Sequence, residues 1–300
     1  MPSLKDIKNR IKGISSTKKI TQAMKIVSAS RLKQSQNNIG KTQHYLKALN
    51  DLLIDLYNLD HSLFFSSHSP YLRKGEGKNV LLVIFSSDKG LCGSFNSKIT
   101  SAVANIIEHN KSQGKNIRLI CVGNKISQYI NAHYKDLMEF SMPFANLENK
   151  NISYNHSASL GQKIRDLFMS GVVDECRVLY TKYHTVMKQE ITNVQLLPFG
   201  IECIEGLSNK EQAGKTVFEV DNKLSNVLES IIVNLINAII FNVYANSITC
   251  EYSARMIAMD GATQNSIKVL KELNLLYNRS RQALITKELM EIISGAEAIN

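Results

Sequence analysis

The 300-residue sequence lacks the residue patterns of disulfide, metal and nucleophile chemistry. Its five cysteines are odd in number, widely spread and form no C-x-x-C pair. This argues against a disulfide framework or a zinc ribbon, and for free thiols in a reducing compartment. The seven histidines include no H-E-x-x-H pattern. We therefore expect no metal ion, no cofactor and no complete catalytic site.

Long apolar runs are also missing. The most apolar helical stretch, residues 231–245, is only fifteen residues long and includes Asn234, Asn237 and Asn242. A membrane span needs eighteen or more apolar residues, so we expect a helix buried in protein, with asparagines able to specify its register. The first twelve residues are charged throughout and no apolar signal segment follows them. We expect the protein to face the cytosol.

A phosphate-binding motif is absent as well. Residues 87–96 read SDKGLCGSFN and follow an apolar run, at the position where α/β folds commonly bind ligands. They match neither G-x-x-x-x-G-K-[ST] nor G-x-G-x-x-G, so no nucleotide site is predicted. We expect a strand-to-helix turn instead, with Asp88 near its start and with Gly90 and Gly93 in strained backbone conformations that suit glycine.

Prolines are few, and the four of them divide the chain into regions of different periodicity: Pro2, Pro70, Pro143 and Pro198. Between residues 78 and 200, continuous apolar runs near 80–85, 117–122 and 176–180 are typical of strands buried on both faces. Helical stretches separate or flank them near 94–113, 124–134 and 156–170. This alternation predicts a small, mostly parallel α/β sheet.

The two ends of the chain predict long helices. Near the N-terminus, apolar residues recur at steps of three and four along a narrow seam made of Leu4, Ile7, Ile11, Ile14, Ile20, Met24, Val27, Leu46, Leu49, Leu53 and Leu56. The pattern fades between Arg31 and Lys47. Helices of about 80 and 120 Å at the two ends exceed the diameter of a compact domain, so they are expected to pair as an antiparallel coiled coil.

The predicted organisation is therefore α/β plus coiled coil, with long N- and C-terminal helices flanking a central α/β domain. The expected boundaries are a helix at 1–60, a linker at 61–77, the α/β domain at 78–200, a connecting loop at 201–216 and a second helix at 217–300.

Positive charge is concentrated in the first fifty residues. They hold eleven lysines and arginines against one acid, Asp6, and so account for the whole net charge of +10. Glutamate is absent there, although an ordinary exposed helix uses it for i,i+4 pairs. Such a basic helix is typical of a partner of nucleic acid, acidic membrane or acidic protein. The near absence of aromatic residues favours an acidic protein surface.

Three blocks of sequence resemble the gamma subunits of F-type ATP synthases. They are ITQAMKIVSASRL at 20–32, SDKGLCGSFN at 87–96 and ITKELMEIISGA at 285–296, the last preceded by YNRSRQA at 277–283 and EYSARM at 251–256. The blocks follow the family order over the whole chain. One departure is Asp260-Gly261, where a helix-favouring pair is expected, because glycine weakens a helix by about 1 kcal/mol relative to alanine.

The resemblance implies a non-catalytic central rotor shaft, an antiparallel coiled coil with a Rossmann-like domain at its foot. It implies that the shaft turns inside a ring of alternating alpha and beta subunits, and that the foot docks on the epsilon subunit and the membrane c-ring. Rotation would couple ion flow to ATP synthesis or hydrolysis. The implied location is peripheral, on the cytoplasmic face of a bacterial plasma membrane. The alternatives are a basic coiled-coil nucleic-acid binder and an α/β enzyme using residues 88–96.

The resemblance also nominates residues for subunit contacts. Four polar positions near the C-terminus are expected between shaft and ring, namely Arg281, Gln282, Thr286 and Glu288. Glu251 and Arg255 would meet the beta subunits or form a pair within their helix. Along the N-terminal helix the positions expected to meet the partner helix or the ring are Lys8, Arg10, Lys18, Lys19, Met24 and Lys25. For each, a solvated or merely packed side chain is the alternative.

Overall fold

The computed structural model describes residues 3–59, 70–72, 77–144, 154–199 and 224–297. The chain divides into two compact units, residues 1–30 with 255–300 and residues 31–254. Most of the predicted linker at 61–77, and all of the predicted connecting loop at 201–216, lie outside the described residues. The domain boundaries stay a prediction.

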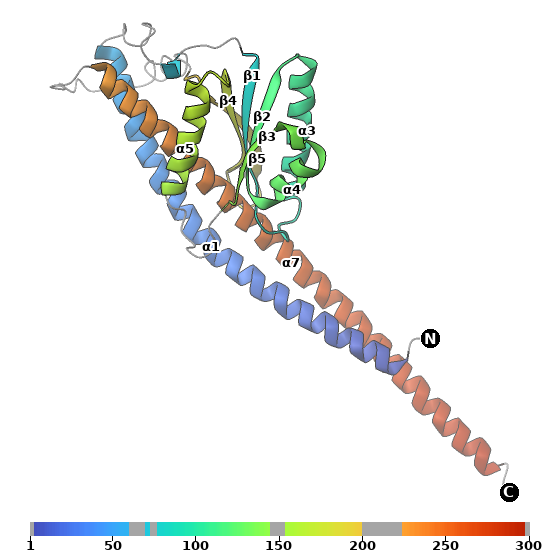
Figure 1. Cartoon of the computed structure of the whole chain (residues 1–300). Coiled ribbons are helices and arrows are strands. Elements are labelled where there is room, and N and C mark those ends of the chain that lie inside the picture. Colours follow the sequence, from blue (N-terminus) through green and yellow to red (C-terminus); the bar gives the residue numbers. More distant parts are fainter. Residues whose placement is uncertain (1–2, 60–69, 73–76, 145–153, 200–223, 298–300) are drawn as a thin grey trace. The chain divides into compact units, whose positions relative to one another are not determined.

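A five-stranded sheet forms the centre of the 31–254 unit (Figure 1). Its order is β3 (Met138–Met142), β2 (Asn116–Val122), β1 (Asn79–Phe85), β4 (Glu175–Tyr183) and β5 (Gln189–Leu197). The first four strands are parallel, and β5 runs antiparallel to β4. The three predicted strands are confirmed as β1, β2 and β4. The two edge strands, β3 and β5, were not predicted.

Helices cover both faces of the sheet in this unit. One hydrophobic cluster joins β1 and β2 to α3 (Phe95–Ser112) and α4 (Asn124–His133). The other joins the opposite face to α5 (Tyr154–Met169), to the end of α1 (Leu4–Leu59) and to the start of α7 (Leu224–Glu297). Two short 3₁₀ turns, η1 (Pro70–Leu72) and η2 (Lys135–Leu137), complete the described elements. The central strand β1 is therefore buried on both faces, as its apolar run predicts.

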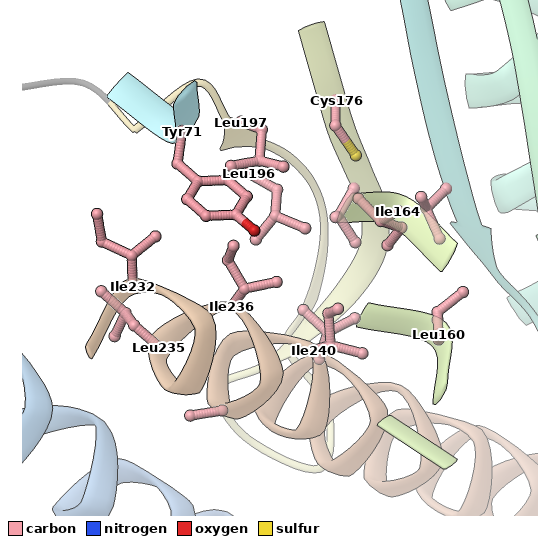
Figure 2. Packing of buried hydrophobic residues seen from close by; sticks show 14 of the residues in the cluster. Tyr71, Leu160, Ile164, Cys176, Leu196, Leu197, Ile232, Leu235, Ile236 and Ile240 are labelled. Atoms are coloured by element: carbon pink, nitrogen blue, oxygen red, sulfur yellow. The ribbon is translucent and has the colours of Figure 1, made fainter. Parts of the chain in front are cut away.

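The α7 side of this core is built from isoleucines one turn apart. Figure 2 shows Ile232, Ile236 and Ile240 of α7 directed toward Tyr71 and the end of β5, with Leu160 of α5 beside them. Helix α5 comes close to α7 because residue 161 is glycine: a Cβ there would collide with the Asn237 side chain. Asn237 Oδ1 accepts a hydrogen bond from Arg165 at 2.9 Å, which satisfies this buried amide.

Helix α7 is apolar enough to cross a membrane by length and composition alone. The stretch Asn226–Ser294 reaches a mean hydropathy of 1.7, and half of its most apolar window is buried inside the protein. Residues 231–245 contribute heavily to the core described above. This burial is the pattern of a core helix, as predicted for that stretch.

Helices α1 and α7 pair antiparallel in each unit. In the unit containing residue 1, Thr263 donates a hydrogen bond to Thr21 at 2.8 Å, and Lys25 Nζ lies 2.7 Å from Asp260 Oδ1. In the 31–254 unit, the Thr42 hydroxyl oxygen lies 3.2 Å from Asn242 Oδ1. Asn242 thus fixes a contact between the helices, as predicted for asparagines in this stretch, and the predicted antiparallel pair is confirmed.

The seam of α1 follows a strict seven-residue repeat. One series of seam positions consists of Ile7, Ile14, Thr21, Ser28, Ser35, Thr42, Leu49 and Leu56, all buried except the half-buried Ile14, and a second series runs through Leu4, Ile11, Lys18, Lys25, Leu32, Ile39, Leu46 and Leu53. The predicted seam was wrong at Ile20 and Val27, which are 60% and 52% exposed. It also does not fade after Arg31, because small hydroxyl residues continue it.

Candidate functional site

The hydroxyl side chains in the α1 seam are satisfied mainly by their own helix. Thr21 donates to the Lys18 carbonyl at 3.0 Å, Ser35 to the Leu32 carbonyl at 2.9 Å and Thr42 to the Ile39 carbonyl at 2.8 Å. Because the buried hydroxyls have partners within α1, they can lie in the seam without the cost of an unpaired polar group. The seam therefore tolerates burial of small polar residues that a hydrophobic pattern search overlooks.

The basic side chains of α1 differ in what they contact. Lys8, Arg10 and Lys19 are exposed, whereas Lys18, Met24 and Lys25 are half-buried along the helix pair. The Lys25–Asp260 ion pair has side chains 42% and 45% exposed, so it contributes well under about 1 kcal/mol. Asp260, one half of the pair that departs from the family pattern, thus supports the helix pairing, whereas Gly261 is exposed.

Helix α7 continues beyond the start of α1. Extrapolated from the Thr21–Thr263 contact, Leu4 lies opposite about residue 280. From residue 281 to residue 294 every side chain is exposed, including the predicted contact residues Arg281, Gln282, Thr286 and Glu288. Thr286 donates to the Gln282 carbonyl at 3.0 Å, and Lys287 pairs with Glu291 at 3.5 Å. The four predicted contact residues thus lie on one stretch of α7 that has no α1 residue opposite it.

This terminal stretch also exposes large apolar side chains. The exposed fraction runs from 42% at Leu284 to 68% at Ile292. Exposed apolar residues on α1 were missed by the sequence reasoning, which placed Ile20 and Val27 in the seam and did not consider Ile26. A contiguous run of exposed apolar residues on a helix marks a surface that another molecule covers. The signal that could have found the α1 residues is the seven-residue frame, which leaves them outside the seam.

Glu251 and Arg255 are placed differently from the other predicted contacts. Both side chains are buried, with 8% of each exposed. A buried charge requires partners, and neither residue is without one. Their burial favours the alternative of a side chain engaged within the chain, and contact with another subunit stays a prediction.

The loop after β1 caps helix α4 with its own groups. Asp88 Oδ1 accepts hydrogen bonds from the Asn124 amide at 3.0 Å and the Phe144 amide at 2.9 Å. The Lys125 amide donates to the Ser87 carbonyl at 3.0 Å, and the Ile126 amide donates to the Ser86 hydroxyl at 3.1 Å. The first amides of α4 are thus bonded to the loop that follows β1. These bonds agree with the predicted structural turn, and its role stays a prediction.

The backbone of this loop differs in part from the prediction. Gly93 has a positive φ of 58°, but Gly90 does not, and the second left-handed residue is Leu91 at 63°. The structure also places an unpredicted glycine here. Gly123 has φ 113°, and a Cβ on it would lie 2.5 Å from the Ser86 oxygen atoms. Only glycine therefore allows α4 to start this close to the end of β1.

The thiols in the described chain sit in a different environment from a reactive cysteine. Cys92, Cys121, Cys176 and Cys250 are all buried. Burial raises the pKa of Cys121 and of Cys250 to about 12 and raises the pKa of Cys176 further. These three thiols are neutral at physiological pH and are poor nucleophiles. Within the described ranges, no group of three His, Cys, Asp or Glu side chains is arranged to hold a metal ion.

Comparison with known proteins assigns the family. The ATP synthase family model matches residues 3–299. The chain is 35% identical over 304 residues to the ATP synthase gamma chain of Rhodospirillum rubrum, and 36% identical over 300 residues to that of Trichlorobacter lovleyi. These alignments cover this chain completely, and they cover 100% and 99% of the two relatives.

Solved structures agree on the fold. A chain of the mitochondrial ATP synthase of Euglena gracilis aligns with a TM-score of 0.69 and 17% identity, covering 99% of this chain and 94% of that one. A chain from the central stalk and c-ring of the Tetrahymena thermophila enzyme aligns with a TM-score of 0.62 and 24% identity, covering 81% of this chain and 99% of that one. With full-length sequence similarity and the same fold, this chain belongs to the ATP synthase gamma chain family.

Proposed function

We propose that this chain is the central rotor shaft of a rotary ATP synthase, the non-catalytic subunit that couples ion-driven rotation of a membrane c-ring to ATP synthesis or hydrolysis in an alpha/beta ring. Family membership supports this role. The observation that carries it is the end of α7, where residues 281–294 form a helix with every side chain exposed and no α1 residue opposite. A terminal helix this apolar requires a surrounding protein surface.

The side chains of residues 281–294 suit contact with a partner surface that the helix slides past. Its polar side chains have few fixed bonds within the described chain, and its apolar side chains offer non-directional contacts. Single exposed ion pairs contribute little, so no one contact needs to break at a high cost during a turn. The shaft can influence the ring only through contacts that differ between the states of each catalytic subunit, so its effect is that of a moving allosteric effector.

The proposed ring contacts follow from exposure. Arg281, Gln282, Thr286 and Glu288 would face the alpha and beta subunits around the terminal helix. Lys8, Arg10 and Lys19 would present the basic face of α1 to acidic side chains of the same ring, while Lys18, Met24 and Lys25 would act mainly in the helix pair. Glu251 and Arg255 would support a ring contact from inside the fold.

The α/β unit would dock on the epsilon subunit and the c-ring. Structures similar to this chain come from ATP synthase assemblies that include a central stalk, a c-ring, F1 and OSCP. Docking on the c-ring would hold the protein peripherally at the membrane. The bacterial relatives support the cytoplasmic face of a bacterial inner membrane as its location.

Affinity purification through a tag on this chain tests the role. Detergent-solubilised membranes are treated with nuclease before capture. The expected result is a complex that contains alpha, beta and c-ring subunits, hydrolyses ATP, and pumps ions when reconstituted into vesicles. Capture of nucleic acid without these subunits, lost steeply as salt rises, would support the basic coiled-coil binder and overturn the proposal.

A further inference from the structure

A polar groove lies on the α/β unit, away from the helix pair. It has a volume of about 410 Å³ and runs between the C-terminal half of α3 and strands β4 and β5. Asn105, His109 and Gln113 line it from α3, Lys115 from the turn before β2, and Arg177 and Asn193 from the sheet. No Asp or Glu is among the described residues that line it.

The groove presents hydrogen-bond donors that the fold leaves unused. The Nε of Arg177 donates to Glu175 at 2.5 Å, which orients the guanidinium and leaves its terminal nitrogens without a partner among the described residues. The Lys115 ammonium and the side-chain amides of Asn105 and Asn193 likewise have no hydrogen bond in the described part of the chain. A planar guanidinium can bind a carboxylate by two parallel hydrogen bonds, and an ammonium that lines the same groove adds a positive charge.

The lining points to a protein rather than to a small molecule as the occupant. Small-molecule sites are mostly apolar and enclose most of their ligand. Here Asn105, His109, Gln113 and Asn193 are all exposed, so the groove is an open surface feature. If an acidic side chain of a larger protein entered the groove, the protein surface around that side chain would cover the groove and exclude water from the ion pair.

The concave shape also limits which protein can occupy the groove. A side chain inserted into a groove and held by paired charges resists sliding, because each displacement breaks the hydrogen bonds together. A protein that stays still while the shaft turns would have to leave the groove in every revolution. A protein that turns with the shaft can remain there.

We propose that the groove at Lys115, Arg177 and Asn193 binds an acidic segment, carrying Asp or Glu, of a protein that rotates together with this chain. The inference rests on the proposed rotor function and adds to it the location and chemistry of one rotor contact. Lys115 supplies the net positive charge, Arg177, which is paired with Glu175, supplies the donors of its terminal nitrogens, and the asparagines on either side of the groove position the carboxylate.

Cross-linking in the assembled complex tests the proposal. Asn193→Cys is labelled with a benzophenone maleimide in a Cys203→Ser background, since the other four cysteines are buried. After illumination, the cross-linked peptide is sequenced by mass spectrometry and ATP hydrolysis is measured. The expected product joins residue 193 to a segment rich in Asp or Glu and leaves ATP hydrolysis intact, because a bond inside the rotor does not stop rotation.

Two variants show whether charge causes the contact. Lys115→Glu should lower the cross-link yield about tenfold or more, since it replaces an ion pair by a like-charge contact. Lys111→Glu is the matched control: it makes the same charge change at the same end of α3, but its ammonium lies over the Tyr134 ring, outside the groove. It should leave the yield unchanged.

Three outcomes overturn the inference. They are a cross-link to an alpha or beta subunit that abolishes ATP hydrolysis, the absence of any protein cross-link, and an equal loss of yield in the Lys111 and Lys115 variants. In each of these, an unlabelled complex that still pumps ions would leave the proposed rotor function standing. An unlabelled complex that fails to assemble would instead contradict the rotor function itself.

Discussion

Replacing Gly261 by alanine should stabilise the pair of long helices. Gly261 lies in the interior of α7, its backbone is helical, and a Cβ added to it meets no atom within 4 Å. Nothing in the fold therefore requires a glycine there. Alanine is favoured over glycine in a helix interior by about 1 kcal/mol, mainly because the unfolded chain loses less backbone freedom. We expect Gly261→Ala to raise the local unfolding free energy by about that amount.

Native-state hydrogen exchange measures this change directly. Amides of residues 257–265 should exchange about fivefold more slowly in the Gly261→Ala chain, which is the rate factor for about 1 kcal/mol. Gly161→Ala is the matched control with the opposite expected sign. A Cβ at residue 161 collides with Asn237, so the same chemical change should lower stability by roughly 1–3 kcal/mol.

Either of two results would contradict the stabilising effect expected at residue 261 and the close packing expected at residue 161. Unchanged or faster exchange around residue 261 would mean that the glycine has a packing or conformational role that its open surroundings do not reveal. A stabilised Gly161→Ala variant would mean that α5 and α7 are not held as closely as the Asn237 contact indicates. Gly13→Ala repeats the test on α1, since a Cβ there also meets nothing within 4 Å.

Three further predictions follow from the described contacts. Asp88→Asn replaces the charged acceptor of the Asn124 and Phe144 amides by a neutral one. It should lower the free energy of unfolding, measured by denaturant titration, by roughly 1–2 kcal/mol, and an unchanged midpoint would contradict the capping role. Lys19→Ala should reduce coupled ATP synthesis only modestly, because its side chain is exposed and a sliding shaft keeps no tight single bond; near-complete loss in a stable, assembled complex would count against this. Burial raises the pKa of Cys121 from about 9 to about 12, so this thiol ionises at lower pH in the unfolded chain than in the folded one. Its contribution to the free energy of unfolding should be constant below pH 9 and should fall between pH 9 and 12 by about 1.4 kcal/mol per pH unit. Cys121→Ala should reduce this dependence of stability on pH.

The sheet was predictable where its strands are buried on both faces. The run Val80–Phe85 is apolar at every position, and only a central strand needs that pattern. The edge strands gave no such signal. In β3, MEFSM alternates half-buried and exposed residues, and β5 carries Thr and Asn among its apolar residues, because an edge strand is only partly covered. Local sequence does not separate strands of this kind from loops.

The helix pair was predictable as an architecture but not residue by residue. Periodicity identified both helices, and Leu49, Leu53 and Leu56 were assigned correctly. The error came from counting only apolar residues. The predicted seam went from Ile14 to Ile20, whereas the next seam position in the structure is the buried Thr21. The predicted strand-to-helix turn at residues 87–96 was also wrong at one point: Leu91, rather than Gly90, takes the left-handed conformation, and no composition rule predicts a leucine there.

The small residues at the centre of the α1 seam have a geometric consequence for a shaft. The distance between packed helices depends on the side chains at their contact, and serine or threonine allows a closer approach than leucine. Thr21, Ser28, Ser35 and Thr42 occupy the same position in four successive seven-residue repeats, between apolar residues at both ends of α1. Leu32 and Ile39 of the second series still bury apolar surface in the middle of the seam, while the small residues of the first series allow a closer approach of the two helices there. For the proposed shaft inside a ring this combination is favourable, because a leucine seam throughout would add stability at the expense of a wider cross-section.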